Sequence, residues 1–197
     1  MPIDVFSRVK DGDLQIINEN PNTCNIKFKG RTKDNKFVVN KLWKKNKTNF
    51  EIFQDLLERS RTYNHSYWCS FGYTGSGKTY TTIGILKQLL DHYLKKSMSI
   101  TFSAYQIYNE KVYDLMDNNA IVKIWKTNNL EFSNLNTVKV VRSDEIIQQI
   151  QELRTKNTTE MNKQSSRSHA FFKVFVGTKT INLIDMAGQE NGNTNMN

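Results

Sequence analysis

The chain has 197 residues, of which 28 are Lys or Arg and 19 are Asp or Glu, so its formal net charge is +9. A hydrophobic fraction of 38% with 24% charged residues is typical of a globular protein and excludes disordered, collagen-like and coiled-coil chains. No apolar run approaches the roughly 18 residues of a membrane span, no signal peptide is present, and the basic residues follow no nucleic-acid recognition motif. We therefore expect a soluble cytoplasmic protein that contacts neither membrane nor nucleic acid.

Helical and strand-like patterns alternate along the chain, which predicts an α/β fold with a mostly parallel central sheet flanked by helices. A capping box formed by Thr48 and Glu51 predicts a helix over residues 49–60. The expected elements after it are a strand at 65–71, a helix at 78–95, strands at 99–105 and 121–125, a helix that Ser143 caps, and a hairpin at 170–184. We expect one domain over residues 1–190 and a disordered tail over residues 191–197.

A glycine-rich loop stands between the strand at 65–71 and the helix at 78–95. Its sequence, which satisfies the pattern G-x-x-x-x-G-K-[ST], is Gly72, Tyr73, Thr74, Gly75, Ser76, Gly77, Lys78 and Thr79. Glycines let consecutive backbone N–H groups point into one concavity, and the following helix directs its positive end to the same place. The pattern predicts a phosphate cradle in which Lys78 reaches the β and γ phosphates and Thr79 ligates Mg²⁺.

Two later segments could sense the γ phosphate and place a water molecule for its hydrolysis. The first, NKQSSRSH over residues 162–169, offers hydroxyls and a guanidinium just before a strand. The second, DMAGQE over residues 185–190, follows a buried strand. Asp185 is placed to hold Mg²⁺ through water, and the N–H of Gly188 can donate to the γ phosphate.

These motifs resemble those of the kinesin motor domains. GYTGSGKTYT is similar to GQTGSGKTYT of that family, NKQSSRSH to its first switch NxxSSRSH, and LIDMAGQE to its second switch LVDLAGSE. The segment AYQIYNEKVYDLM over residues 104–116 resembles the family's EIYNEKVYDLL, which has no part in nucleotide chemistry. That match favours kinesin over myosin or another NTPase.

The resemblance implies a P-loop NTPase fold, ATP and Mg²⁺ as ligands, ATP hydrolysis and microtubule-based movement. It implies that Thr79 and Ser166 ligate Mg²⁺ and that Asp185 holds the ion through water. Ser165 would help to position the attacking water, and Arg167 would pair with Glu190 to close the pocket. Microtubules would be the partner, with a cytoskeletal location; the sequence leaves the oligomeric state open.

The chain also departs from the family pattern. The motif R-x-R-P, whose first Arg and Pro flank the adenine, corresponds at best to residues 18–21 and leaves only Pro21. The long loop that interrupts the helix after the phosphate loop is nearly absent. The sequence also stops seven residues after Glu190, so we expect the carboxyl-terminal third of a motor domain to be missing, with weak ATPase activity and little motility.

Other readings remain open at this point. The chain could be a non-catalytic interaction module that binds tubulin or a motor partner through its positive charge. It could also be a remnant without function. Stabilisation by Mg·ATP would favour the ATP-binding motor domain over the interaction module, and failure to fold cooperatively would favour the remnant.

Overall fold

The computed structural model describes residues 4–8, 14–19, 24–28, 36–44, 46–126, 130–160 and 167–189. The chain divides into two compact units, Met1–Ile52 and Phe53–Asn197, each considered by itself. Within the described ranges, no helix is long and apolar enough to cross a membrane.

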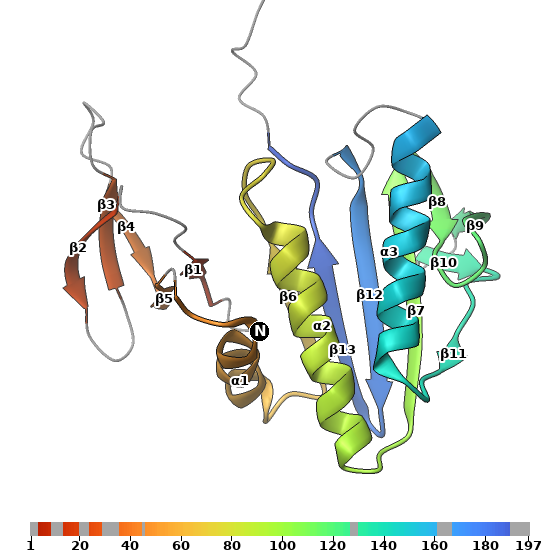
Figure 1. Cartoon of the computed structure of the whole chain (residues 1–197), viewed down its shortest axis with the longest axis horizontal. Helices are drawn as coiled ribbons and strands as arrows, with labels where there is room; N and C mark the ends of the chain where they lie inside the picture. Colours follow the sequence, from red (N-terminus) through yellow and green to blue (C-terminus); the bar gives the residue numbers. More distant parts are fainter. Residues whose placement is uncertain are drawn as a thin grey trace, which may run out of the picture. The chain divides into compact units, whose positions relative to one another are not determined.

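The first unit is built from short strands that the sequence patterns did not predict (Figure 1). β2 (Leu14–Glu19), β3 (Cys24–Phe28) and β4 (Lys36–Val39) form an antiparallel sheet. β1 (Phe6–Arg8) pairs in parallel with β5 (Lys41–Trp43), and the rings of Phe6 and Trp43 stack with their centroids 4.9 Å apart. Trp43 is thereby buried.

Helix α1 (Asn49–Ser60) begins where the capping box predicts. The Thr48 amide donates to the Glu51 carboxylate at 2.8 Å, and the Glu51 amide donates to the Thr48 hydroxyl at 3.2 Å. These bonds satisfy backbone donors that the first helical turn leaves without a partner. The backbone and side-chain bonds from Thr48 and the nearby Lys47 lower the pKa of Glu51 to about 2.

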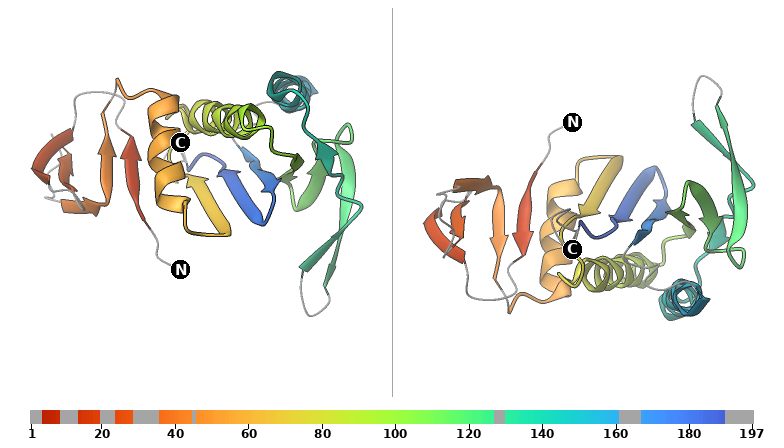
Figure 2. Two further views of the ribbon diagram at one scale, coloured as in Figure 1. Left: turned by 90° about the horizontal axis from the view of Figure 1, so that it is seen from below. Right: turned by 90° about the horizontal axis from the view of Figure 1, so that it is seen from above.

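The second unit contains an eight-stranded sheet and two long helices. Its strands, in chain order, are β6 (His65–Ser70), β7 (Ile100–Tyr108), β8 (Lys111–Asp114), β9 (Ala120–Lys126), β10 (Leu130–Ser133), β11 (Val138–Lys139), β12 (His169–Val176) and β13 (Lys179–Asp185). The order across the sheet is β10-β9-β8-β7-β12-β13-β6, with β11 paired to β7. Helices α2 (Lys78–Lys95) and α3 (Ser143–Glu160) lie on the same face of this sheet (Figure 2).

The sheet is mixed, and the expectation of a mostly parallel sheet is wrong. β13 and β6 form its one parallel pair among the described strands, and the other pairings are antiparallel. Tight turns join β7 to β8 and β12 to β13, and such short connections can only produce antiparallel neighbours. Gly177 makes the second turn with a left-handed φ of 57°.

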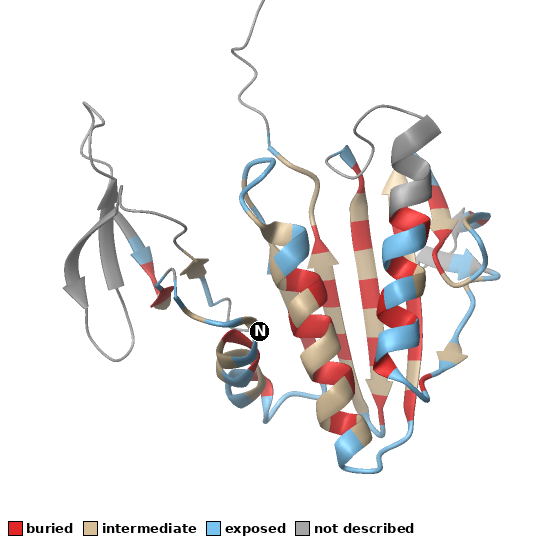
Figure 3. Cartoon of the chain, in the orientation of Figure 1, coloured by how far each residue is buried: buried red, intermediate tan, exposed pale blue. Residues whose placement is uncertain are grey.

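The core of this unit lies between the sheet and its two helices. Buried residues alternate with half-exposed ones along β12 and form a stripe along α2 and α3 (Figure 3). The fully buried members include Leu86, Leu89 and Leu90 of α2, Ile150 of α3 and Phe172 of β12. This packing fixes the ends of β6 and β13, which are parallel and therefore finish at the same edge of the sheet.

Candidate functional site

The glycine-rich loop connects the end of β6 to the start of α2. Gly75 and Gly77 have φ values of 77° and 91°, a conformation that residues with a Cβ rarely adopt. Gly77 is the N-cap of α2 and makes no side-chain capping bond. Backbone N–H groups in the first turn of the helix can therefore donate hydrogen bonds to an anion. The loop therefore has the local geometry of a phosphate cradle.

Lys78 lies at the start of α2 and folds back over the loop. Its ammonium group donates to the carbonyl oxygens of Gly72 and Tyr73 at 2.9 and 2.8 Å. These two bonds hold the cation beside the concavity. A phosphate oxygen would be a stronger acceptor for the same donors because the bond is then charge-assisted on both sides.

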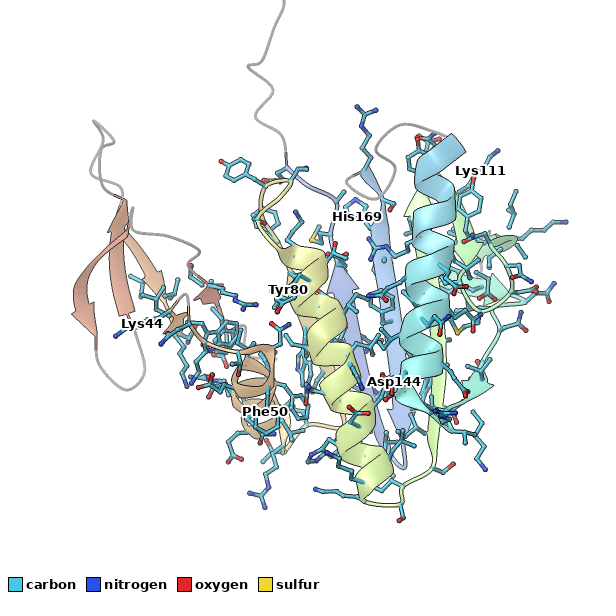
Figure 4. All side chains as sticks on the ribbon, in the orientation of Figure 1. Lys44, Phe50, Tyr80, Lys111, Asp144 and His169 are labelled. Atoms are coloured by element: carbon cyan, nitrogen blue, oxygen red, sulfur yellow. The ribbon has the colours of Figure 1, made fainter. Side chains whose placement is uncertain are left out.

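A pocket of about 250 Å³ opens in front of the loop. Its lining combines loop residues with the turn after β13 and consists of Thr74, Gly75, Gly77, Lys78, Thr79, Tyr80, Met186 and Gly188. Tyr80, 71% exposed on the first turn of α2 (Figure 4), adds an aromatic ring to this lining. The structure thus brings together the glycine-rich loop and the second of the two later motifs.

Thr79 and Asp185 connect these two parts of the site. The Thr79 hydroxyl donates to Oδ2 of Asp185 at 2.7 Å, across 106 residues of sequence. Asp185 ends β13 and is 1% exposed. A hydroxyl and a carboxylate side by side are oxygen ligands of the kind that Mg²⁺ prefers.

Gly188 packs directly against the glycine-rich loop. A Cβ built at this position would lie 2.0 Å from the Thr74 hydroxyl oxygen and 3.0 Å from the Thr74 amide nitrogen. The adjacent Gln189 amide donates to the carbonyl of Gly72 at 3.2 Å. The close approach requires glycine and places the backbone of this turn against the phosphate loop.

Arg154 is a residue of the site that the sequence analysis missed. It lies on α3, is 7% exposed, and its Nη1 donates to Oδ2 of Asp185 at 2.8 Å. Asp185 therefore receives two donors on one carboxylate oxygen. A signal existed in the sequence, since Arg154 follows Ile147 and Ile150 by seven and four residues and so falls on the apolar face of its helix.

Three buried polar atoms, two of them in this ion pair, lack a hydrogen-bond partner among the described residues. They are Oδ1 of Asp185, Nη2 of Arg154 and the hydroxyl oxygen of Ser168. Buried polar groups normally have a partner, and the cost of leaving one without is about 1–3 kcal/mol. The unsatisfied carboxylate oxygen beside Thr79 fits a cation or a cation-bound water.

Cys69 lies on β6, opposite Ile184 of β13. Desolvation and the negative charge of Asp185 raise the pKa of its thiol. The group therefore stays protonated at neutral pH, and it offers no thiolate nucleophile.

The remaining residues of the sequence analysis divide into two groups. Arg167 is described and exposed, just before β12. Pro21, Ser165, Ser166 and Glu190 lie outside the described residues, as does the expected tail. The pairing of Arg167 with Glu190 and the metal-ligand role of Ser166 therefore stay predictions.

Comparisons with known proteins agree with these features. The family model of the kinesin motor domain matches residues 7–197. The mouse kinesin-like protein KIF18A is 28% identical over 82% of this chain and 22% of its own length, and diatom spindle kinesin-1 of Cylindrotheca fusiformis is 34% identical over 62% of this chain and 22% of its own. This chain thus spans about a fifth of the length of these relatives.

Solved structures show the same fold. The carboxyl-terminal motor domain of Kar3 from Candida glabrata matches with a TM-score of 0.73 and 22% identity, over 97% of this chain and 75% of that one. The structure of a fast kinesin matches with a TM-score of 0.76 and 19% identity, over 98% of this chain and 68% of that one. Because the family model covers nearly the whole chain, the protein belongs to the kinesin motor domain family.

Proposed function

We propose that this chain binds Mg·ATP in the pocket between the glycine-rich loop and the turn after β13, and that it hydrolyses the γ phosphate. The observation that carries the proposal is the 2.7 Å bond between Thr79 and Asp185. It joins the residue after the loop lysine to the carboxylate that ends β13. An ATPase needs the glycine-rich loop and the turn after β13 at one place, because the loop holds the phosphates and the turn responds to the third phosphate.

In the proposed complex, the backbone amides from Gly75 to Thr79 hold the phosphate oxygens, and Lys78 exchanges its carbonyl acceptors for phosphate oxygens. The Gly188 amide donates to the γ phosphate from the opposite wall. The ring of Tyr80, which lines the pocket, would contact the base. When bound, Mg²⁺ would neutralise charge on the phosphate oxygens, and Thr79, Ser166 and Asp185 would hold it.

For hydrolysis, Ser165 would help to position the attacking water. Arg167 and Glu190 would close the pocket as an ion pair, because neither charge is favourable alone in a partly dry site. Ser165 and Arg167 belong to the segment before β12, whereas Glu190 belongs to the segment after β13. Closure of the pocket would therefore bring both motifs together around the third phosphate.

Nucleotide binding is tested by thermal or chemical unfolding with and without Mg·ATP. We expect stabilisation of about 2.7 kcal/mol at a nucleotide concentration 100 times Kd. Lys78→Ala should abolish the shift, whereas Lys111→Ala, on β8, should retain it. An unmodified chain that shows no shift would favour the non-catalytic interaction module instead.

Hydrolysis is tested separately with Glu190→Ala. This variant should bind Mg·ATP with unchanged affinity and hydrolyse it more slowly than the unmodified chain. Phosphate release at the original rate would contradict the role assigned to Glu190.

At the level of the family, we propose microtubules as the partner and a cytoskeletal location, with ATP hydrolysis coupled to movement. Cosedimentation with microtubules, with and without a non-hydrolysable ATP analogue, tests the contact. Binding that changes with the nucleotide would support the proposal. Absence from the pellet in both conditions would contradict it.

A further inference from the structure

The turn from Met186 to Gln189 is anchored through its backbone amides. Three of its four N–H groups donate hydrogen bonds: Met186 to the Ser70 carbonyl at 3.2 Å, Ala187 to Nδ1 of His169 at 3.3 Å, and Gln189 to the Gly72 carbonyl at 3.2 Å. For the fourth, that of Gly188, the described part of the chain provides no acceptor. Among the described residues, one donor without an acceptor thus stands between two anchored neighbours, at the wall of the pocket.

His169 supplies the one side-chain acceptor among these three bonds. It is the first residue of β12, is half-buried, and lies at the end of the sheet where the phosphate loop stands (Figure 4). The other two acceptors are carbonyls of β6 and of the loop itself, which a substitution leaves in place. His169 is therefore the point at which a side chain controls the orientation of the turn.

The position of the Gly188 donor is sensitive to small rotations of this turn. Gly188 already lies against Thr74, as the 2.0 Å approach of a hypothetical Cβ shows. Rotation of the Ala187 peptide group would turn the next N–H relative to the phosphate loop. Hydrogen bonds weaken steeply when the donor angle falls, so orientation matters as much as distance.

We propose that His169 is a positioning residue for recognition of the γ phosphate. By accepting the Ala187 N–H at Nδ1, it directs the Gly188 N–H into the pocket. This inference rests on the proposed function, because it needs a triphosphate in the pocket. It also requires that the proton of the neutral ring is on Nε2, so that Nδ1 has its lone pair free. His169 thereby links the segment before β12 to the turn after β13.

Three substitutions separate this role from a structural one. In His169→Asn, the amide oxygen can take the place of Nδ1. In His169→Leu the acceptor is lost at similar size, and in His169→Gln the acceptor lies one bond further from the backbone. His65→Leu is the matched control, since His65 is exposed at the opposite end of β6.

The experiment measures Kd for Mg·ADP and for Mg·AMP-PNP, a non-hydrolysable ATP analogue, by displacement of a fluorescent nucleotide. His169→Leu and His169→Gln should each weaken AMP-PNP binding about three- to tenfold, the worth of one neutral hydrogen bond. Binding of ADP should stay unchanged, because ADP lacks the phosphate that Gly188 contacts. His169→Asn should restore the preference for the triphosphate, and His65→Leu should never lose it.

Equal weakening of both nucleotides, or no change in either, would overturn the role of His169, as would failure of Asn to restore the preference. If His169→Leu does not fold, His169→Gln decides the same question. The proposed function itself would be overturned if the unmodified chain bound neither nucleotide although a cooperative unfolding transition showed that it is folded. The inference about His169 would then fall as well.

Discussion

At the residue scale, Asp185 is the buried carboxylate of the described site, and its charge depends on its hydrogen-bond donors. It is 1% exposed, and its one bonded oxygen accepts from both Arg154 and Thr79. A buried ion pair is not in itself a strong source of stability, because both charges lose their water. Loss of one partner is much worse, since an uncompensated buried charge remains.

Arg154→Met should therefore destabilise the fold strongly, by about 3–5 kcal/mol. Arg142→Met is the matched control, because Arg142 pairs with Glu145 at 3.4 Å with side chains 71% and 64% exposed. An exposed pair of this kind contributes about 0–1 kcal/mol. Urea unfolding of both variants measures the difference. Equal, small losses would show that the charge of Asp185 is compensated without Arg154.

At the element scale, a charged cluster joins α2 to α3. Lys87 of α2 contacts Asp91 at 3.0 Å and Asp144, in the first turn of α3, at 2.9 Å. The hydroxyl of Ser143 donates to the second oxygen of Asp91. Ser143 was predicted to cap α3, but its hydroxyl donates to the neighbouring helix instead.

The pKa shifts of this cluster have opposite signs. Hydrogen bonds from Lys87 to Asp144 and Asp91 raise the pKa of Lys87. Burial opposes the ionisation of Asp91, but the bonds from Ser143 and Lys87 outweigh it and lower the pKa of Asp91. Stability from Asp91 is thus present above its unfolded pKa of about 3.9 and is lost as pH falls through the lower folded value. Stability from Lys87 is complete below about pH 10.4 and is lost as pH rises through the higher folded value.

Lys87→Met should therefore reduce the free energy of unfolding between about pH 5 and pH 9. Because the Lys87 side chain is 37% exposed, screening limits the loss to below about 1 kcal/mol. The difference from the unmodified chain should shrink at both pH extremes. Chemical unfolding over a pH series checks this. A loss that stays the same at every pH would assign the effect to packing of the lysine stem.

Sequence predicted the elements best where their signals are local. The capping box located α1, and the apolar period of α2 located that helix from Lys78 to Lys95. Strand direction was predicted only where a short turn joins neighbours, as in the hairpin at 170–184. The pairing of β12 with β7 joins strands that are far apart in the sequence and is also antiparallel, so the expectation of a mostly parallel sheet failed. The phosphate loop was predicted from its motif, whereas the contact of Arg154 with Asp185 joins residues 31 positions apart and needed the fold.

At the scale of the whole molecule, α2 and α3 leave the other face of the large sheet without a helix from the described part of the second unit (Figure 2). On that face, residues of β12 such as Phe171 and Phe175 are half-exposed. The rings of Tyr105 and Phe171 stack there with centroids 4.8 Å apart. Among its described residues, this unit therefore has half-exposed aromatic rings on that face, whereas α2 and α3 cover the other face.

Within the same unit, β6 is the end strand of the sheet. Proteins usually protect such strands with charged side chains or proline, and β6 has neither in its sequence HSYWCS. Tyr67, 62% exposed, adds an apolar side chain to this strand. We expect residues 1–197 to self-associate at high concentration through this strand and to do so less with Tyr67→Lys, because a lysine at the edge opposes pairing with a second strand.

Sedimentation velocity over a concentration series measures the effect, with Tyr63→Lys as control because Tyr63 is 40% exposed but precedes the strand. The net charge increases by one in both variants, so a general effect of charge on solubility would lower association equally. Only an effect at the edge of β6 would lower the association of Tyr67→Lys more than that of Tyr63→Lys. Equal association of all three proteins would mean that another part of the chain protects β6, and the aromatic face would then be the next surface to test.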